Sequence, residues 1–222
     1  MNNNIFMRSE KCPICGAITK QPHYKARTYI LQKTDYDLYS HYKGINPLYY
    51  GAKLCNTCGY ANFSNIFEKP KNTLKLMREE YNGVKKTWVP WDIPEENDIV
   101  YAIKLHKLVL MNYMNDKNIL VGEVAYVCLK LYWLNKELGN TLERDRYRRL
   151  ALDKFTRSYM EQAFPICNIL DQDTAIYLIA ILYFEEGNIK ECKKWLSLLI
   201  QNELVSTKLK KRVTDFKLDM LK

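Results

Sequence analysis

The sequence predicts an α+β protein that is mainly α: a small four-cysteine, zinc-ribbon-like β head followed by a TPR-like antiparallel helical stack. Three observations support this class. Two Cys-x-x-Cys-Gly motifs lie in the first quarter of the chain, the residue pattern changes from β-rich to helical near residue 64, and a late helix pair has tetratricopeptide-like spacing. The predicted domains are a zinc-binding head over 1–63, a helix and Trp/Pro-rich connecting strap over 64–96, and a TPR-like helical domain over 97–222.

The two cysteine motifs predict a metal centre. Two residues between cysteines let one tight turn direct both sulfur atoms at a single ion, and the following glycine tolerates the positive φ that closes the turn. Four thiolates suit Zn²⁺ best among intracellular metals and leave no open coordination position. We therefore expect one structural zinc, in a zinc ribbon or a treble clef, bound by Cys12, Cys15, Cys55 and Cys58.

Length and composition favour a soluble protein of one large or two small domains. The 222 residues are 47% hydrophobic and 27% charged. The polar start predicts no signal peptide, and the longest uncharged apolar run, 175–184, is about half of the ~20 residues that span a bilayer. We expect no membrane association and a cytoplasmic location, where Cys128, Cys167 and Cys192 are small core residues rather than disulfide partners.

The head is expected to contain two strands between the cysteine pairs. Residues 24–31 are β-rich and partly alternating, Asp35-Tyr36-Asp37 interrupts them, and a turn at 43–47 precedes a second strand over 48–54. A head of this size buries little apolar surface. A structural zinc adds roughly 10–16 kcal/mol of apparent binding free energy, which in such heads stabilises the fold.

Helical periodicity dominates after the head. Leu74, Met77 and Tyr81 predict a helix over 72–81, whereas two prolines make 88–94 an extended strap that lies on the helices. Six further helices are expected from apolar periodicity, caps and glycine stops. They cover about 97–114, 118–138, 141–163, 171–186, 189–201 and 206–221.

The fourth and fifth of these helices carry the tetratricopeptide-like pattern. The small residues Ala180 and Cys192 stand where such helices approach most closely, and Gly187 stands at the turn. An ordinary antiparallel helix pair with an apolar contact face would show the same spacing of apolar and small residues. The apolar and small positions of the pattern are Ile176, Ile179, Ala180, Tyr183, Cys192, Leu196 and Leu199.

A set of motifs in the head resembles a known family. In chain order these are Cys12-Pro13-x-Cys15-Gly16, Arg27, Asp35-x-Asp37, Tyr42-x-Gly44-x-Asn46-Pro47-Leu48-Tyr49-Tyr50 and Cys55-x-x-Cys58-Gly59-Tyr60-Ala61. Together they look like an uncharacterised bacterial family, common in Gram-positive anaerobes, that is defined only as a domain of unknown function. The resemblance covers essentially the whole chain and implies a four-cysteine head joined to TPR-like helices. It implies no activity. One departure is Lys33-Thr34 before Asp35, where the family tends to have Arg or Lys directly before its first Asp.

Catalysis is not expected from this sequence. Thioredoxin-like chemistry uses one Cys-x-x-Cys motif in a βαβ context, and no phosphate loop, nucleophile elbow or His-Glu-x-x-His motif is present. Arg27, Asp35 and Asp37 could form a polar site beside the metal head. Alternatively, Arg27 pairs with one carboxylate and fixes the loop between the strands.

Two classes of function remain, and the first is an interaction or scaffold protein with a protein or peptide partner. Its predicted partner surface recognises an acidic segment through arginines on the third helix: Arg144, Arg146, Arg148 and Arg149. A solvated charged face explains them equally well. If the arginines recognise a partner, charge reversal of Arg148 and Arg149 should abolish partner capture and barely change thermal stability.

The alternative is a nucleic-acid-binding protein. The net charge of +9 is a mild bias toward polyanions, and aromatic faces in a positive field can stack on single-stranded bases. The head has basic residues interleaved with eight tyrosines: Tyr24, Tyr29, Tyr36, Tyr39, Tyr42, Tyr49, Tyr50 and Tyr60. Tyrosine also builds the core of a small β-rich head, so these residues fit both alternatives.

Overall fold

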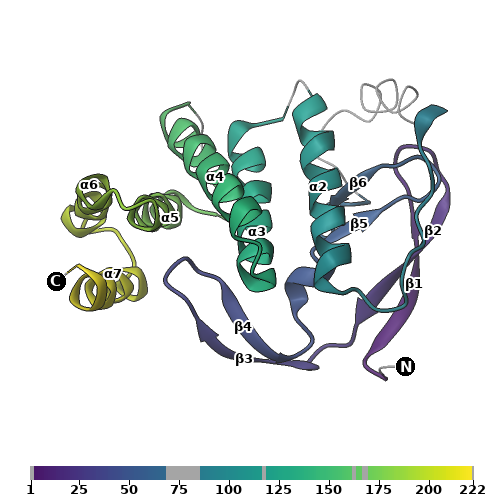
Figure 1. The fold of residues 1–222 in the computed structure, drawn as a ribbon, viewed down its shortest axis with the longest axis horizontal. Helices are drawn as coiled ribbons and strands as arrows, with labels where there is room; N and C mark the ends of the chain where they lie inside the picture. Colours follow the sequence, from purple (N-terminus) through teal and green to yellow (C-terminus); the bar gives the residue numbers. More distant parts are fainter. Residues whose placement is uncertain (1–2, 69–85, 117–118, 162–163, 167–169, 222) are drawn as a thin grey trace. The chain divides into compact units, whose positions relative to one another are not determined.

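The computed structural model of the chain describes residues 3–68, 86–116, 119–161, 164–166 and 170–221 (Figure 1). Over these residues, short β-hairpins are followed by helices, which confirms the predicted mainly-α α+β class. Two compact units are present. Unit 1 comprises residues 1–32 and 42–119, and unit 2 comprises residues 33–41 and 120–222. The predicted helix over 72–81 and Cys167 lie outside the described residues.

Two β-hairpins form the base of unit 1, and each has a cysteine motif at its turn. Strands β1 (Ile5–Lys11) and β2 (Ile18–Tyr24) pair antiparallel, with Lys11 opposite Ile18. Strands β5 (Ala52–Leu54) and β6 (Ala61–Phe63) do the same, with Leu54 opposite Ala61. Both cysteine turns are thus held by the strand pairs on either side of them.

The strand predictions for the head are partly wrong. The predicted strand over 24–31 is interrupted by a turn, in which Arg27 has a φ of 66°, before β3 (Tyr29–Thr34) begins. The predicted strand over 48–54 starts instead as a short 3₁₀ helix, η1 (Pro47–Tyr50). Asn46 caps η1 by accepting a hydrogen bond from the Leu48 amide at 3.0 Å, and proline at the first helical position suits this turn. This local capping overrides the β propensity of the residues that follow.

Helix α2 (Ile99–Asn115) belongs to unit 1, whereas the predicted boundary at 97 joins it to the other helices. The Asp98 side chain caps its start, as the sequence predicts. Asn112 donates to the Ala61 carbonyl at 3.2 Å, and the Tyr113 hydroxyl donates to Asn62 at 2.7 Å. These bonds and the burial of Tyr113 fix α2 on the β5–β6 hairpin.

Residues 88–94, before α2, form neither helix nor strand, as their prolines predict, and this strap also binds the second cysteine turn. The Asn56 side chain donates to the Trp91 carbonyl at 2.6 Å, and the Trp88 indole donates to the Asn56 carbonyl at 2.9 Å. The expected helix contact is present at Trp91, whose ring lies edge-on to Tyr101 of α2 at 6.5 Å.

The hairpin of β3 and β4 (Ser40–Gly44) connects the two units along the chain. Its tip, residues 33–41, is part of unit 2. We call these residues the hairpin tip. The turn is closed by the Asp37 side chain, which accepts from the Tyr39 amide at 3.0 Å, and by Leu38 with a φ of 67°. The interruption predicted at Asp35-Tyr36-Asp37 is therefore a tight turn between paired strands.

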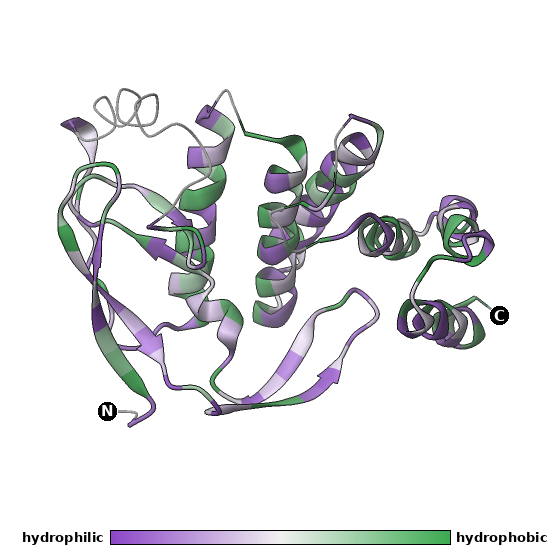
Figure 2. Cartoon of the chain, turned by 180° about the vertical axis from the view of Figure 1, so that it is seen from behind, coloured by the Kyte–Doolittle hydropathy of each residue, from purple (hydrophilic) through white to green (hydrophobic). Residues whose placement is uncertain are grey.

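The described part of unit 2 contains five helices, close to the predicted ranges: α3 (Val121–Leu138), α4 (Thr141–Glu161), α5 (Gln172–Glu185), α6 (Ile189–Gln201) and α7 (Thr207–Met220). Helices α3 and α4 pack together across Gly139, and α5 and α6 pack across Gly187; both glycines have a positive φ. Hydrophilic and hydrophobic residues alternate around most of these helices (Figure 2). Helix α5 differs, because residues 175–182 are all buried.

None of the helices in the described ranges combines the length and apolarity that a bilayer-crossing helix requires.

Candidate functional site

The four predicted ligands lie together in unit 1. The Sγ atoms of Cys12 and Cys58 are 3.8 Å apart, those of Cys15 and Cys55 are 3.6 Å apart, and all four lie within 4.8 Å of one another. A tetrahedral ion with metal–sulfur bonds of about 2.3 Å requires sulfur–sulfur distances of about 3.8 Å. The cluster therefore has the dimensions of a four-thiolate metal centre.

Backbone hydrogen bonds shape both cysteine turns in the same way. The Gly16 amide donates to the Cys12 carbonyl at 3.0 Å, and the Gly59 amide donates to the Cys55 carbonyl at 2.9 Å. Both glycines have left-handed φ values, 76° and 78°. At Gly59 there is a second requirement, because a Cβ atom would lie 2.7 Å from the Trp88 ring. The second turn thus needs glycine for its φ and for the close approach of the strap.

The ionisation of the thiols also fits a bound cation. Hydrogen bonding from Cys12 lowers the pKa of Cys55, whereas hydrogen bonding with Cys55 raises the pKa of Cys12 to about 12. The pKa of Cys58 is raised as well, through its contact with Cys12. Crowded sulfur atoms without a cation thus favour one thiolate over several. A divalent cation would stabilise all four thiolates at once.

The cluster is enclosed by apolar side chains. Cys12, Cys55 and Cys58 are buried with Ile14, Tyr60 and Phe67, and Cys15 is half-buried. Four protein ligands in an enclosed site leave no position for water or substrate, which is typical of a structural metal. The four cysteines could hold one metal ion without taking part in a reaction.

Neither histidine of the head is near enough to compete as a ligand, since both bind carboxylates. His23 Nε2 lies 2.8 Å from Glu10, and His41 Nε2 lies 2.8 Å from Asp35. Glu10 is buried and also binds Lys53. Burial alone would raise the pKa of Glu10, but hydrogen bonds from His23 and Lys53 lower it. Sequence spacing gave no signal for this group of Glu10, His23 and Lys53, because the three residues come from three different strands.

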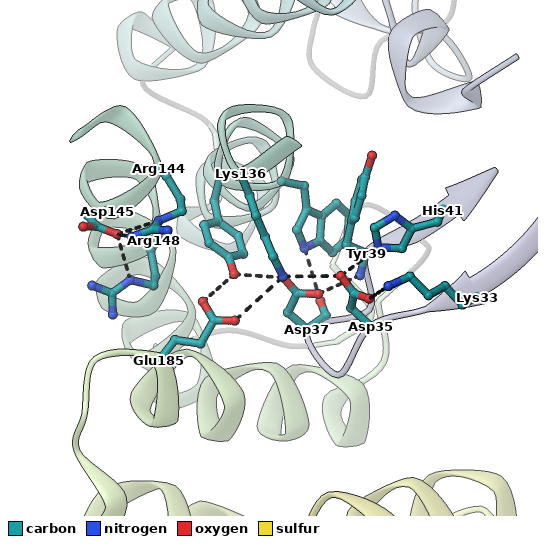
Figure 3. A network of polar contacts seen from close by, with 12 residues as sticks. Lys33, Asp35, Asp37, Tyr39, His41, Lys136, Arg144, Asp145, Arg148 and Glu185 are labelled. Atoms are coloured by element: carbon teal, nitrogen blue, oxygen red, sulfur yellow. Dashed lines mark hydrogen bonds and ion pairs between the residues drawn. The ribbon is translucent and has the colours of Figure 1, made fainter. Parts of the chain in front are cut away.

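A second polar site lies in unit 2, where the hairpin tip meets helix α3 (Figure 3). The Asp37 side chain is fully buried and accepts from Lys136 Nζ and from the Tyr132 hydroxyl, each at 2.8 Å. The Trp133 indole donates to the Asp37 carbonyl at 3.2 Å. One turn of α3 therefore holds this aspartate by its carboxylate and its backbone.

Asp35 joins the same network. It lies 2.8 Å from His41 and 3.5 Å from both Lys33 and Lys136. Burial alone would raise its pKa, but the hydrogen bond from His41 and the charge of Lys136 lower it. Arg212 of α7 donates to the Asp35 carbonyl at 3.1 Å. Asp35 is thus held as an anion among three cationic or ionisable neighbours.

Glu185 of α5 completes the network and is the least neutralised of its carboxylates. Its Oε1 atom lies 4.0 Å from Lys136 Nζ, and its Oε2 atom contacts the Tyr132 hydroxyl that also faces Asp37. The Tyr132 hydroxyl has one hydrogen to donate, so Glu185 and Asp37 compete for it. Burial raises the pKa of Glu185, because the charged form is poorly solvated at this position.

The network opens into a pocket of about 420 Å³ within unit 2. Its lining combines the three carboxylates and Lys136 with aromatic and aliphatic side chains of α5 and α7. Sequence reasoning singled out Asp35 and Asp37 but missed Lys136, Tyr132 and Glu185. Only the tertiary fold brings these residues together from α3 and α5.

A family model described as an uncharacterized protein conserved in bacteria (DUF2225) matches residues 5–220. The chain belongs to this family. The match confirms the resemblance that the cysteine and hairpin motifs indicate. Neither a curated protein nor a solved structure matches the chain. The TPR-like character of the helices is not confirmed and stays a prediction.

In this DUF2225 chain the predicted trio of Arg27, Asp35 and Asp37 is divided. Both aspartates belong to unit 2 and bind Lys136, whereas Arg27 is exposed in a turn of unit 1. Lys136 thus takes the role of counter-ion that the sequence suggested for Arg27.

The four arginines of α4 do not form a free basic surface. Arg144 pairs with Asp145 at 2.8 Å, and Arg146 pairs with Glu143 at 3.1 Å. The other two, Arg148 and Arg149, were also expected to be free for a partner, but both bind Glu186 at the end of α5.

The Arg148 side chain is 7% exposed and that of Arg149 is 68% exposed. The prediction that Arg148 is a solvated charge is therefore wrong, because the contact between α4 and α5 covers it.

The head tyrosines have packing roles. All eight are buried or half-buried. In unit 1, Tyr24 lies edge-on to Tyr29 at 5.6 Å and to Tyr50 at 5.2 Å, and Tyr29 lies edge-on to Tyr42 at 5.4 Å. Rings that pack edge-on against one another are less available to stack on bases.

Proposed function

We propose that this DUF2225 protein is a zinc-containing protein-interaction or scaffold protein with no catalytic activity of its own. The observation that carries the zinc assignment is the closed cluster of four cysteine sulfurs, since all-sulfur tetrahedral sites select Zn²⁺ among common intracellular metals. In this proposal the ion stabilises unit 1. Thiolate ligands stay reduced in the cytoplasm, where we propose that the protein acts.

A groove along α4 and α5 supports the interaction role. Its volume is about 580 Å³, and it is lined by apolar Leu152 and Met160 between charged residues of both signs, including Arg149 and Glu161. Met160 is 72% exposed. An apolar centre with a charged rim is typical of grooves that receive an amphipathic segment of a partner. We propose a protein or peptide partner that places apolar side chains against Met160.

Capture of partners on the purified, metal-loaded chain tests this role. Met160→Glu should abolish capture because it places a charge at the apolar centre of the groove. Met114→Glu is a matched control, since Met114 has the same 72% exposure but lies on α2. Failure of the wild-type chain to capture any protein would overturn the proposal, and equal capture by Met160→Glu would exclude this groove.

Metal analysis of the purified chain tests the zinc assignment separately. About one equivalent of zinc per chain is expected, and Cys55→Ser should reduce it strongly. Less than half an equivalent from cells grown with ample zinc, or a different metal at one equivalent, would contradict the assignment.

The remaining support for the nucleic-acid alternative is the positive charge of the head, because its tyrosines are engaged in packing. It predicts binding to single-stranded DNA or RNA that falls steeply with salt and with Lys25→Ala and Arg27→Ala. Saturable binding with these properties would favour the alternative over the scaffold role.

A further inference from the structure

The pocket beside the hairpin tip has two chemically different walls. One wall is acidic and contains Asp35, Asp37 and Glu185 around the single ammonium group of Lys136. The other wall is aromatic and aliphatic and includes Tyr36, Phe184 and Phe216. None of its lining residues lines the α4–α5 groove, so a ligand here would be distinct from the proposed protein partner.

The aromatic wall is a continuous set of rings. Tyr36 lies edge-on to Phe216 with ring centroids 5.1 Å apart, and Phe184 lies edge-on to Phe216 at the same distance. Aromatic faces attract cations through their quadrupole and pack equally well against methylene groups. A wall of this kind beside carboxylates favours a cation that is carried on an apolar chain.

The acidic wall has charge left for such a cation. Asp37 is paired closely with Lys136, and Asp35 with His41 and Lys33. Among the described residues, Glu185 has the 4.0 Å approach of the same lysine, a hydroxyl shared with Asp37 and the charge of Arg148, with which no ion pair is formed. A ligand ammonium group next to Glu185 would complete the pairing.

We propose that this pocket binds an aliphatic polyamine, with its ammonium groups at the acidic wall near Glu185 and its methylene chain against Tyr36, Phe184 and Phe216. The volume of about 420 Å³ is in the range of small-molecule sites, which are about 300–1,000 Å³. An anionic ligand would meet three carboxylates, and a neutral apolar ligand would leave them without a new partner. The mixed lining therefore selects a cation with an apolar body.

Isothermal titration of the full metal-loaded chain with spermidine tests the proposal. One saturable site per chain is expected, and the neutral chain 1,8-octanediol should not bind. Glu185→Gln keeps the size and a hydrogen bond to Tyr132 but removes the charge, and it should weaken spermidine binding about tenfold or more. Tyr36→Leu removes one ring of the aromatic wall and should also weaken binding, by a smaller factor.

Glu203→Gln is the matched control for net charge, because Glu203 is exposed in the connection between α6 and α7 and does not line the pocket. It should bind spermidine like the wild-type chain. Equal affinity in the wild-type, Glu185→Gln and Glu203→Gln chains would show that binding is a nonspecific effect of charge and would overturn the proposal. Absence of saturable binding by the folded wild-type chain would overturn it too.

A lysine side chain of a peptide presents the same ammonium group, so a lysine-containing peptide is titrated in parallel. Tight peptide binding that is sensitive to Glu185→Gln, together with weak spermidine binding, would replace the polyamine by a peptide at this pocket. Capture through the α4–α5 groove is measured with Met160→Glu, so the two proposals can fail independently.

Discussion

Arg148 and Arg149 are neighbours in the chain, but their surroundings differ. Both approach Glu186, yet the Arg148 side chain is almost fully buried between α4 and α5, and that of Arg149 is mostly in solvent. Removing one partner of a buried ion pair leaves an uncompensated charge, whereas an exposed pair contributes little to stability. The two positions therefore form a matched pair for measuring how much burial of an ion pair with Glu186 contributes to the free energy of unfolding.

Charge reversal at these positions should separate the two roles. Arg148→Glu should lower the free energy of unfolding by about 3 kcal/mol or more, because it places two carboxylates together in a buried contact. Arg149→Glu should change it by less than about 1 kcal/mol. Urea unfolding followed by far-UV circular dichroism measures both. Equal, small losses would mean that Arg148 can reach solvent and that the burial described above does not persist in solution.

Individual site residues could be predicted from the sequence where their spacing alone determines which side chains can reach one ion. Two residues between cysteines and a glycine after them are typical of a metal-binding turn, so the four cysteines that lie together could be named. The buried arginine could not be identified in this way. A run of arginines on a polar helix is usually a solvated face, and only the packing of α5 against α4 distinguishes one of them.

At the scale of single elements, the conformation of the hairpin tip depends on contacts with another element, because residues of α3 bind its aspartates. Asp35 has a lowered pKa in the folded chain, through His41 and Lys136 after the opposing effect of burial. A carboxyl group with a lowered folded pKa stabilises the fold above its unfolded pKa of about 3.9, and this contribution is lost as pH falls through the folded value.

Asp35→Asn should therefore destabilise the chain at pH 7, by about 2 kcal/mol, and have progressively less effect below pH 4. The measurement is urea unfolding of variant and wild-type chains across this pH range. Asp153→Asn is the control, because Asp153 is an exposed acid on α4 and should show little effect at any pH. A difference that stays constant down to pH 3 would show that Asp35 acts through packing and not through its charge.

Helices were the elements that the sequence predicted best. Their caps and stops, such as Asp98 and Gly139, are local signals that tertiary contacts did not override. Short strands were predicted less well. Strands β1, β2, β4 and β6 were not anticipated, and partners of the hairpin tip on α3 lie about a hundred residues away along the chain, beyond the range of any periodic pattern.

For the whole molecule, the effect of metal removal follows from the division into units. With the predicted head over 1–63, chelation would be expected to unfold the head and to spare all later helices. Because α2 is fixed on the β5–β6 hairpin, it should be lost with the metal, whereas α3 to α7 belong to unit 2 and should remain.

Chelation under reducing conditions should therefore remove the contribution of α2 from the far-UV helical signal, about one sixth of that from the helices of the described ranges, and spare that of α3 to α7. Readdition of zinc should restore it. Retention of the full signal would mean that α2 does not depend on the metal centre, and loss of the entire signal would mean that the two units unfold together.

The path of the chain has a consequence for the gene. Because unit 2 contains residues 33–41 and unit 1 resumes at 42, the coding sequence of unit 1 is interrupted by a short stretch that specifies part of the other unit. No single crossover point in the gene separates the two. A recombination event at codon 120 would transfer Lys136 without Asp37, and would leave the transferred helices with a half-buried amine that has lost its closest counter-ion. Selection should therefore keep the two units in one reading frame and transmit them together.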